Sequence, residues 1–461
     1  MNPGWVYSAN MAFRLAVLVF VAMAMGADWP RFRGPNGSGV GEGTGLPVEF
    51  GPTKNVAWRT AAPFGRSSPV VVGGRVFLTA SEGGALLTLA YDLATGKELW
   101  RQSVQPAALR PIYKANDAAA PTAASDGKNL FVFFQDFGLI SYSLEGKERW
   151  RHPLGPFVNF YGIGSSPLVA NGLVVMLCDQ IKGSFAIAVD AATGKQKWRR
   201  ERPEAPDGWG VPVVWKDELV MVGSTRVEGY QLATGETKWW MPLMSNGSMG
   251  SAVFYKDTVV VTATGSEQPW LPAFPLALDK DGDGLLSAVE VKEEKGWVEH
   301  FGWVDGDGNG KLTAAEWEAA RQFGVGEYGA VAIPLGGTGK VEPKWRVKRN
   351  LPYVPSALVY GGVLYMVKSG GIVTSMDPAT GTVLKQGRAT GALGEYFASP
   401  VAADGKIYAV NAEGKLAVLT AGAQWEVLQV NDLGDEVFAT PAISGARLVV
   451  RTREWLYAFG R

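Results

Sequence analysis

The sequence has little cysteine and histidine, which excludes several kinds of protein. Its 461 residues include one cysteine and two histidines. A disulfide framework needs paired cysteines and a zinc cluster needs several Cys or His ligands, so neither is expected, nor is most histidine-based catalysis. Basic and acidic residues balance at 44 each. A neutral chain lacks the basic field that nucleic acids require, so no nucleic-acid partner is expected.

Charged residues are also scarce, at 19%, whereas hydrophobic residues reach 47%. A chain of this composition can bury a large core and is not expected to be disordered. The 59 glycines and 27 prolines indicate many turns, and the 17 tryptophans supply large side chains for packing. The length fits two or three ordinary domains or one large repeat architecture.

The sequence has no apolar run long enough to span a membrane, and the apolar run near the N-terminus is too short to do so. Eleven uncharged residues, 15–25, follow Arg14 and precede the small residues Gly26 and Ala27. This order predicts a cleavable signal peptide over residues 1–27, with translation starting at Met1 or Met11. A buried N-terminal helix is the alternative. We therefore expect a periplasmic or secreted protein with no transmembrane segment.

A short motif repeats along the chain, in which a proline after a small residue opens a β-branched run. Such prolines lie at positions 69, 121, 167, 212, 400 and 441, and copies without proline are centred on Ala252 and Ala357. The eight marks are 40 to 52 residues apart, apart from one interval of 105. This spacing predicts eight repeat units and about 60 extra residues in the fifth.

Each unit has the pattern of four antiparallel strands. Glycine-containing turns such as Gly73-Gly74 separate β-branched runs, which is a hairpin signal. A Thr-Gly-Lys turn then precedes a tryptophan, as in residues 95–100 and 193–198. Four-strand units of this length predict an all-β, eight-bladed β-propeller, with residues 54–61 as the closing strand of the last blade. A stack of β-sandwiches is the alternative, but it does not explain eight marks.

The segment DLATGKELW, residues 92–100, resembles the tryptophan-docking repeat of pyrroloquinoline quinone (PQQ) dehydrogenases. The non-enzymatic outer-membrane assembly factor BamB has similar repeats. Residues 29–37, WPRFRGPNG, resemble the mature N-terminus of secreted bacterial PQQ-like propeller proteins. The resemblance covers residues 28–461 except for the insertion. It implies the fold, but not an activity, because the family holds both enzymes and binding proteins.

The extra residues, 266–325, contain two twelve-residue segments that fit the EF-hand calcium loop. They begin at Asp279 and Asp305 and end at Glu290 and Glu316. Calcium prefers six to eight oxygen ligands, and the EF-hand loop supplies them from fixed positions around a glycine that permits a sharp bend. The predicted ligands, with Leu285 and Lys311 acting through their backbone carbonyls, are Asp279, Asp281, Asp283, Leu285, Glu290, Asp305, Asp307, Asn309, Lys311 and Glu316.

The same residues predict a small α-helical insertion in the fifth blade, between propeller segments 28–265 and 326–461. Ser287 with Glu290 and Thr313 with Glu316 fit capping boxes, so acidic turns before capped helices are the alternative. Three prolines before the first loop preclude a regular entering helix. We expect Leu286 and Leu312 to be adjacent if the loops pair. Residues 279–318 hold eleven acidic side chains and four lysines, a net charge of −7.

A PQQ dehydrogenase would resemble an enzyme with adjacent cysteines, a cofactor calcium and an aspartate base. The single cysteine cannot supply the cysteine pair, so PQQ is not expected as a cofactor. The expected cofactor is Ca²⁺ at two sites. Cys178 ends an apolar strand pattern and is interpreted as a core residue.

Other polar residues give weaker signals. His152 and His300 have no acid and nucleophile nearby in sequence and are interpreted as structural or surface residues. The loop acids are either channel-lining groups or solvated turn residues: Asp117, Asp136, Asp179 and Glu395. The tryptophan series is interpreted as packing rather than sugar stacking: Trp100, Trp150, Trp198 and Trp239.

The sequence therefore favours an exported, non-catalytic propeller that binds calcium and acts as a binding or scaffold protein. Its loops are expected to contact an unknown protein or glycan, and a monomer is expected. The alternative is a PQQ-dependent oxidoreductase acting on alcohols or sugars.

Overall fold

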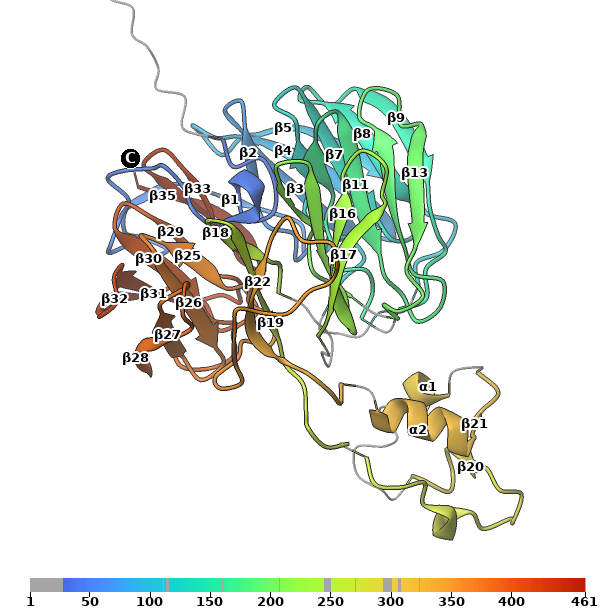
Figure 1. Ribbon diagram of the computed structural model, residues 1–461. Coiled ribbons are helices and arrows are strands. Elements are labelled where there is room, and N and C mark those ends of the chain that lie inside the picture. Colours follow the sequence, from blue (N-terminus) through green and yellow to red (C-terminus); the bar gives the residue numbers. More distant parts are fainter. Residues whose placement is uncertain are drawn as a thin grey trace, which may run out of the picture.

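The computed structural model describes residues 28–110, 112, 116–159, 161–206, 208–243, 250–269, 271–292, 301–305, 308–322 and 324–460. The predicted signal peptide lies outside these residues. Eight antiparallel sheets form a ring, from which the insertion extends as an arm (Figure 1). The predicted eight-bladed all-β propeller is confirmed. No helix within the described ranges is both long and apolar enough to cross a membrane.

Each blade begins with a short inner strand and ends with an exposed outer strand. Blades 1 to 4 comprise β2 (Val70–Val72), β3 (Arg75–Glu82), β4 (Ala85–Asp92) and β5 (Glu98–Val104); β6 (Ala124–Ser125), β7 (Asn129–Phe134), β8 (Gly138–Ser143) and β9 (Glu148–Pro153); β10 (Leu168–Ala170), β11 (Leu173–Cys178), β12 (Phe185–Asp190) and β13 (Gln196–Glu201); and β14 (Val213–Trp215), β15 (Glu218–Val222), β16 (Arg226–Gln231) and β17 (Thr237–Pro242).

Blades 5 to 8 repeat this order. They comprise β18 (Val253–Tyr255), β19 (Thr258–Ala263), β22 (Gly329–Pro334) and β24 (Trp345–Val347); β25 (Leu358–Tyr360), β26 (Val363–Lys368), β27 (Ile372–Met376) and β28 (Val383–Arg388); β29 (Val401–Ala403), β30 (Lys406–Val410), β31 (Lys415–Thr420) and β32 (Val427–Asp432); and β33 (Ala442–Ser444), β34 (Arg447–Arg451), β35 (Trp455–Gly460) and β1 (Val56–Ala61). A fifth strand, β23 (Gly339–Lys340), pairs in parallel with β17.

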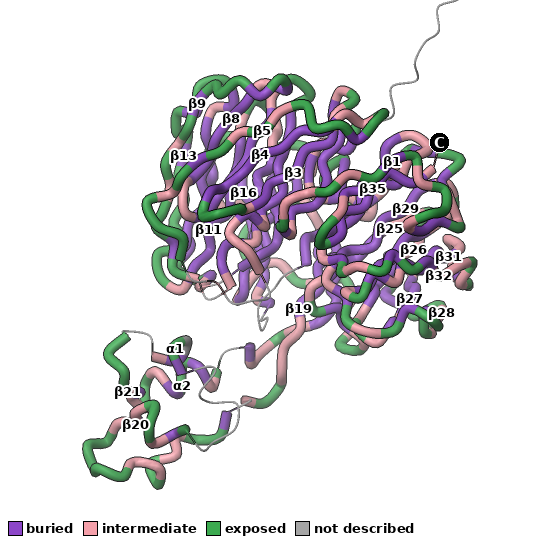
Figure 2. The backbone as a smooth tube through the Cα atoms, turned by 180° about the vertical axis from the view of Figure 1, so that it is seen from behind, coloured by how far each residue is buried: buried purple, intermediate pink, exposed green. Residues whose placement is uncertain are grey.

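The ring closes because its last sheet combines both ends of the chain. Residues 54–61, the segment expected to close the ring, contain β1, which pairs with β35. The second and third strands of the blades are almost wholly buried, and Figure 2 shows the buried backbone concentrated in the ring. Burial of these apolar faces between neighbouring sheets is the main driving force for the fold.

A ring of serine and threonine hydroxyls joins the inner strands. The hydroxyl at the start of each blade accepts a hydrogen bond from the corresponding backbone N–H of the preceding blade at 2.9 to 3.0 Å. Seven such bonds run through Ser68, Thr122, Ser166, Ser251, Ser356, Ser399 and Thr440. Val211 holds the eighth position and has no hydroxyl.

This ring corrects one of the predicted repeat marks. In the second blade the hydroxyl comes from Thr122, so Ala123 occupies the place that proline has in most other blades. The mark at Pro121 is therefore wrong by two residues. The structural repeat follows the hydroxyl that accepts a hydrogen bond from the preceding blade, whereas proline is only a frequent neighbour of it.

The N-terminal segment, residues 28–50, crosses one mouth of the central channel. Trp29 pairs with Val71 in blade 1, and the Asn36 side chain pairs with the backbone of Val214 in blade 4. Val40 lies beside β29 in blade 7. A chain that contacts inner strands of blades 1, 4 and 7 must pass over the channel. The short helix η1 (Pro35–Gly37) lies within this segment.

Two arginines of this segment are buried among the inner strands. Arg31 Nη2 donates to the Pro212 carbonyl at 2.5 Å, and Arg33 Nη2 donates to the Ala357 carbonyl at 2.6 Å. Burial lowers the pKa of each arginine to about 9. Inner strands leave one edge without a neighbouring strand, so these donors and the backbone of the segment satisfy carbonyls that would otherwise line the channel unpaired.

Candidate functional site

The insertion between β19 and β22 forms a separate small unit. Its base is a bridge between Ser266 and Val325, at the two ends of the expected insertion. The unit contains η2 (Leu276–Leu278), β20 (Leu286–Ser287), α1 (Phe301–Val304), β21 (Lys311–Leu312) and α2 (Ala314–Gln322). Its core includes Leu286, Leu312 and Trp317. Strands β20 and β21 pair with Leu286 opposite Leu312, so the predicted adjacency of these leucines is confirmed.

The described residues do not show the predicted EF-hand pair in full. Within the described part of the insertion, α2 is the only helix longer than one turn. The prolines before the first loop leave only the short helix η2 there, and Gly284 and Gly310 have the positive φ that the loop bend requires. Asp307 lies outside the described residues. The full EF-hand pair therefore remains a prediction.

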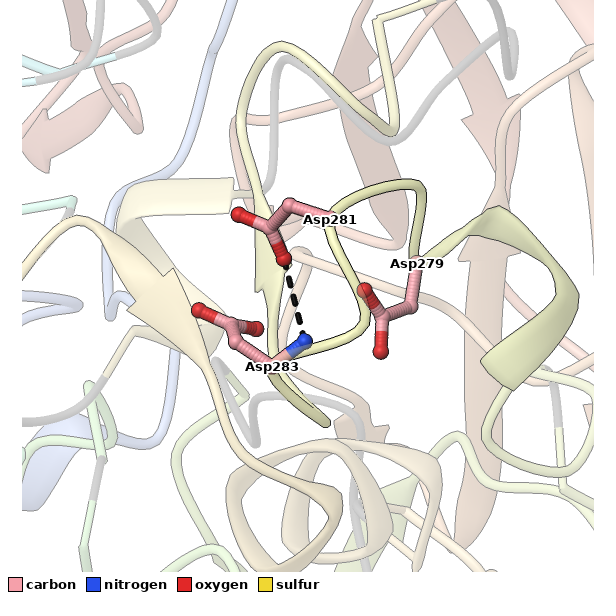
Figure 3. A group of neighbouring side chains, drawn as sticks. All are labelled: Asp279, Asp281 and Asp283. Atoms are coloured by element: carbon pink, nitrogen blue, oxygen red, sulfur yellow. Dashed lines mark hydrogen bonds between the residues drawn. The ribbon is translucent and has the colours of Figure 1, made fainter.

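The first loop brings three of its predicted carboxylates together. Ligand oxygens of Asp279, Asp281 and Asp283 all lie within 4.8 Å of one another (Figure 3). The Asp279 carboxylate accepts hydrogen bonds from the backbone N–H groups of Gly282 and Gly284 at 2.7 and 2.8 Å. These bonds fold the backbone around the first carboxylate. Three convergent carboxylates form an oxygen-rich donor set, which suits a hard cation such as calcium.

Glu290 closes this loop. Its carboxylate accepts hydrogen bonds from the backbone N–H groups of Lys280 and Ser287, both at 2.8 Å. These bonds lower the pKa of Glu290 to about 2, with the Ser287 N–H making the largest contribution. The last predicted ligand is therefore ionised at neutral pH and held against both ends of the loop. Leu285, whose carbonyl is the predicted ligand, donates its N–H to Asp283 at 2.8 Å.

The second loop has the same backbone pattern over its described residues. The Asp305 carboxylate accepts hydrogen bonds from Asn309 and Gly310, and Asn309 accepts one from Lys311. Glu316 Oε2 accepts from the Thr313 N–H at 2.9 Å, while Thr313 Oγ1 accepts from the Glu316 N–H at 3.1 Å. This reciprocal pair confirms the predicted capping box at the start of α2.

Lys311 connects the two loops. Its ammonium contacts Asp283 and lies 3.8 Å from an Asp281 oxygen. The hydrogen bond from Lys311 lowers the pKa of Asp283, so this carboxylate also stays ionised at neutral pH. The sequence predicted only the backbone role of Lys311, because the contact depends on the pairing of β20 with β21.

A cavity of 330 Å³ lies at the centre of the ring. It lies against five of the inner hydroxyls, the loops that enter seven of the blades, and Phe32 of the N-terminal segment. Tyr161 meets Trp209 edge-on at 5.8 Å, and the Arg66 guanidinium lies 3.8 Å from the centre of the Phe438 ring. Its aromatic wall comprises Phe32, Tyr161, Trp209, Tyr353, Phe397 and Phe438. These residues were not predictable from the sequence, because they come from the loops of five different blades and from the N-terminal segment.

The predicted loop acids do not form one site. Asp179 is fully buried and pairs with Arg202 at 2.9 Å, so the interpretation as a channel-lining or solvated residue is wrong for it. Burial raises the pKa of Asp179. Glu395 is exposed, and Asp117 and Asp136 are partly buried. None of these four is among the residues found to line the cavity.

The Arg202 pair belongs to a larger buried cluster between blades 3 and 4. Arg202 Nη1 also contacts Glu228 and the Tyr230 hydroxyl, both at 2.6 Å. These charges are paired and hydrogen-bonded, as burial requires. The residues are up to 51 positions apart in the chain, so local sequence patterns did not reveal the cluster.

Two other residues considered in the sequence, Cys178 and His152, lie within the blades of the ring. Cys178 is buried in β11 and burial raises its thiol pKa well above the ordinary value, which confirms the core interpretation. A ring nitrogen of His152 lies 2.9 Å from the Gly194 carbonyl of the next blade. His300 lies outside the described residues.

Comparison with known proteins gives a family match over most of the chain. The family model described as outer membrane protein assembly factor BamB matches residues 40–157, 87–266 and 184–459. The BamB of Burkholderia pseudomallei is 28% identical over 247 residues, covering 51% of this chain and 56% of that protein. The quinohemoprotein alcohol dehydrogenase ADH IIB of Pseudomonas putida is 31% identical over 115 residues, covering 24% of this chain and 17% of that protein.

Solved structures share the fold at low sequence identity. BamB from Moraxella catarrhalis is 11% identical with a TM-score of 0.54, covering 88% of this chain and 98% of its own. A europium-containing methanol dehydrogenase is 12% identical with a TM-score of 0.61, covering 94% and 98%. Identities this low support the fold alone. The curated relatives are each matched over less than two thirds of their length.

Proposed function

Because the chain belongs to the family of the outer membrane protein assembly factor BamB, we propose that it is an exported, non-catalytic propeller that binds a protein partner and carries a calcium-binding arm. Export rests on the N-terminal sequence, and partner binding rests on the name and role of the family. The observation that carries the calcium proposal is the convergence of Asp279, Asp281 and Asp283 within 4.8 Å.

The residues present fit calcium. Each loop presents carboxylates around a positive-φ glycine. Glu290 is held across the first loop by the Lys280 N–H, and Glu316 is held at the end of the second loop by the Thr313 N–H. Bound calcium would supply positive charge that screens the repulsion within the arm and fixes the loop geometry. Because β20 of the first loop pairs with β21 of the second, calcium bound at one loop would also help to order the other loop. The proposed affinity is in the range of extracellular modules, about 10⁻⁴ to 10⁻³ M.

Isothermal titration calorimetry of the full chain tests the calcium proposal. The unaltered protein is expected to take up two equivalents of calcium at millimolar free ion, and Asp281→Asn, which keeps one oxygen but removes a negative charge, is expected to weaken uptake at the first loop. Asp257→Asn is the matched control, because Asp257 is an exposed turn residue of the ring that pairs with Lys344. Absence of calcium uptake by the unaltered protein would contradict the proposal.

A quinone-dependent oxidoreductase is the second candidate function. It is favoured by the aromatic cavity at the ring centre and by the local similarity to a quinohemoprotein alcohol dehydrogenase. Against it, the sequence has one cysteine, and that residue is buried in β11. Incubation with PQQ and calcium, followed by an absorption spectrum and a dye-reduction assay with alcohols and sugars, separates the two functions. We expect no bound quinone spectrum and no dye reduction.

A further inference from the structure

Exposed apolar side chains gather on the face of the ring where the cavity loops lie. Five of the exposed large hydrophobic residues belong to five different connections that lead from one blade to the next: Phe64, Leu109, Val158, Tyr353 and Leu393. Connections of this kind also supply most of the cavity wall. Soluble proteins seldom place several large apolar groups together on one face unless that face makes contacts.

The cavity on this face is shaped for one anchoring side chain. Its volume of 330 Å³ is at the lower end for small-molecule pockets but accommodates an aromatic side chain. The N-terminal segment crosses the opposite mouth and contributes Phe32, so entry is from the loop face. Tyr353 both lines the cavity and is 46% exposed. A deep aromatic pocket with an apolar rim is the arrangement in which one partner side chain supplies most of the binding energy.

The arm attached to this face carries a strong negative charge. Strands alternate in direction, so the connection between the second and third strand of a blade emerges on the face where the chain enters that blade. The insertion lies in such a connection, between β19 and β22. Its residues 279–318 have a net charge of −7, which two calcium ions would reduce to −3. The arm therefore attracts a positively charged partner whether or not calcium is bound.

We propose that this face binds a basic segment of another polypeptide, which inserts an aromatic side chain into the cavity while its Lys or Arg residues face the acidic arm. The inference rests on the proposed partner-binding function and specifies the chemistry of the partner. The Phe and Trp rings of the wall stack with the inserted ring, and Asn116 provides a polar group at the cavity.

A random peptide library displayed on phage, selected against the full chain, tests this inference. Selected sequences are expected to contain an aromatic residue flanked by Lys or Arg. A synthetic copy of the selected peptide, measured by fluorescence anisotropy, should bind Tyr353→Ala about tenfold or more weakly, as for the loss of an anchoring contact. Leu428→Ala is the control, because Leu428 is an equally exposed apolar residue on the outer strand β32. Its affinity should be unchanged.

The salt dependence of the affinity distinguishes the contribution of charge from the contribution of the inserted aromatic side chain. Affinity for the unaltered protein should fall as ionic strength rises, because exposed charges are screened. Selected peptides without an aromatic residue, equal binding to Tyr353→Ala, or equally tight binding of free tyrosine amide would each overturn the inference. Failure to select any peptide while calorimetry still reports calcium uptake would overturn this inference and leave the calcium proposal intact.

Discussion

At the scale of single residues, one contact between tryptophan and glycine is repeated around the ring. Tryptophan Nε1 on an outer strand donates to a carbonyl of the next blade at 2.8 to 3.0 Å, as for Trp58, Trp100, Trp150, Trp198 and Trp345. The tryptophan ring covers a glycine of that blade with positive φ. Trp239 differs, because its Nε1 donates to Glu218 of its own blade at 2.6 Å.

Substitution of Gly194 by alanine tests the contact between tryptophan and glycine. A Cβ added to Gly194 would lie 2.6 Å from a ring carbon of Trp150, and its φ is +70°. Gly172 has a similar φ of +74° but has no atom within 4 Å of the added Cβ. Gly172→Ala should lose about 1 to 2 kcal/mol of unfolding free energy from backbone strain alone. Gly194→Ala should lose clearly more, measured by urea unfolding. Equal losses would show that the tryptophan does not pack tightly on the glycine.

Val211 is the one break in the hydroxyl ring. Val211→Thr keeps the shape of the side chain and places a hydroxyl where seven other blades have one. The new bond from the Ser166 N–H should raise the free energy of unfolding by about 1 kcal/mol. Val213→Thr, which places a hydroxyl in the apolar core, should instead lower it. Destabilisation by Val211→Thr would show that the hydroxyls do not hold the blades together.

The lowered pKa of Glu290 predicts how the stability of the arm changes at acidic pH. Its folded pKa of about 2 lies below the ordinary value of 4.5, so the carboxylate stabilises the folded loop fully above pH 4.5. This stabilisation is lost as the pH falls from 4.5 towards 2. Limited proteolysis at stepped pH should show faster cleavage near residues 279–290 over this range. Glu290→Gln, which cannot ionise, should weaken this pH dependence, while Asp283 still contributes because its pKa is also lowered; an unchanged pH dependence in the Gln variant would contradict the assignment.

At the scale of elements, the N-terminal segment replaces a missing strand along several inner edges. Asn36 uses both ends of its side-chain amide, donating to the Val214 carbonyl at 2.7 Å and accepting from its N–H at 3.1 Å. The sequence indicated residues 29–37 only as a resemblance. Its role was not predictable, because Asn36 and Val214 are 178 positions apart and neither belongs to a periodic pattern.

Asn36→Ala tests the role of this segment. The substitution removes both bonds to Val214, so the Val214 amide should exchange with deuterium faster, in proportion to a local loss of about 1 to 3 kcal/mol. Exchange at Val174, in the buried strand β11 of another blade, should stay unchanged. Unchanged exchange at Val214 would show that the segment is not paired with blade 4 in solution.

At the scale of the whole molecule, the repeat marks and the turn chemistry were sufficient to predict the number of blades. Short-range hairpin signals specify each sheet, and the repeated Thr-Gly-Lys turn with its tryptophan specifies how neighbouring sheets pack. The arm was located from its spacing and charge, and its prolines predicted that no regular helix enters the first loop, where only η2 lies. The central cavity was not predictable, since each of seven blades contributes only two or three residues to it.

The central claim is that calcium orders the arm and leaves the ring unchanged. Hydrogen–deuterium exchange of the full chain with millimolar calcium or with chelator tests it most directly. Peptides covering residues 279–292 and 308–316 should become protected when calcium is present, while peptides from the buried strands of the ring should exchange alike in both conditions. Unchanged exchange in the arm, or protection confined to the ring, would contradict the account.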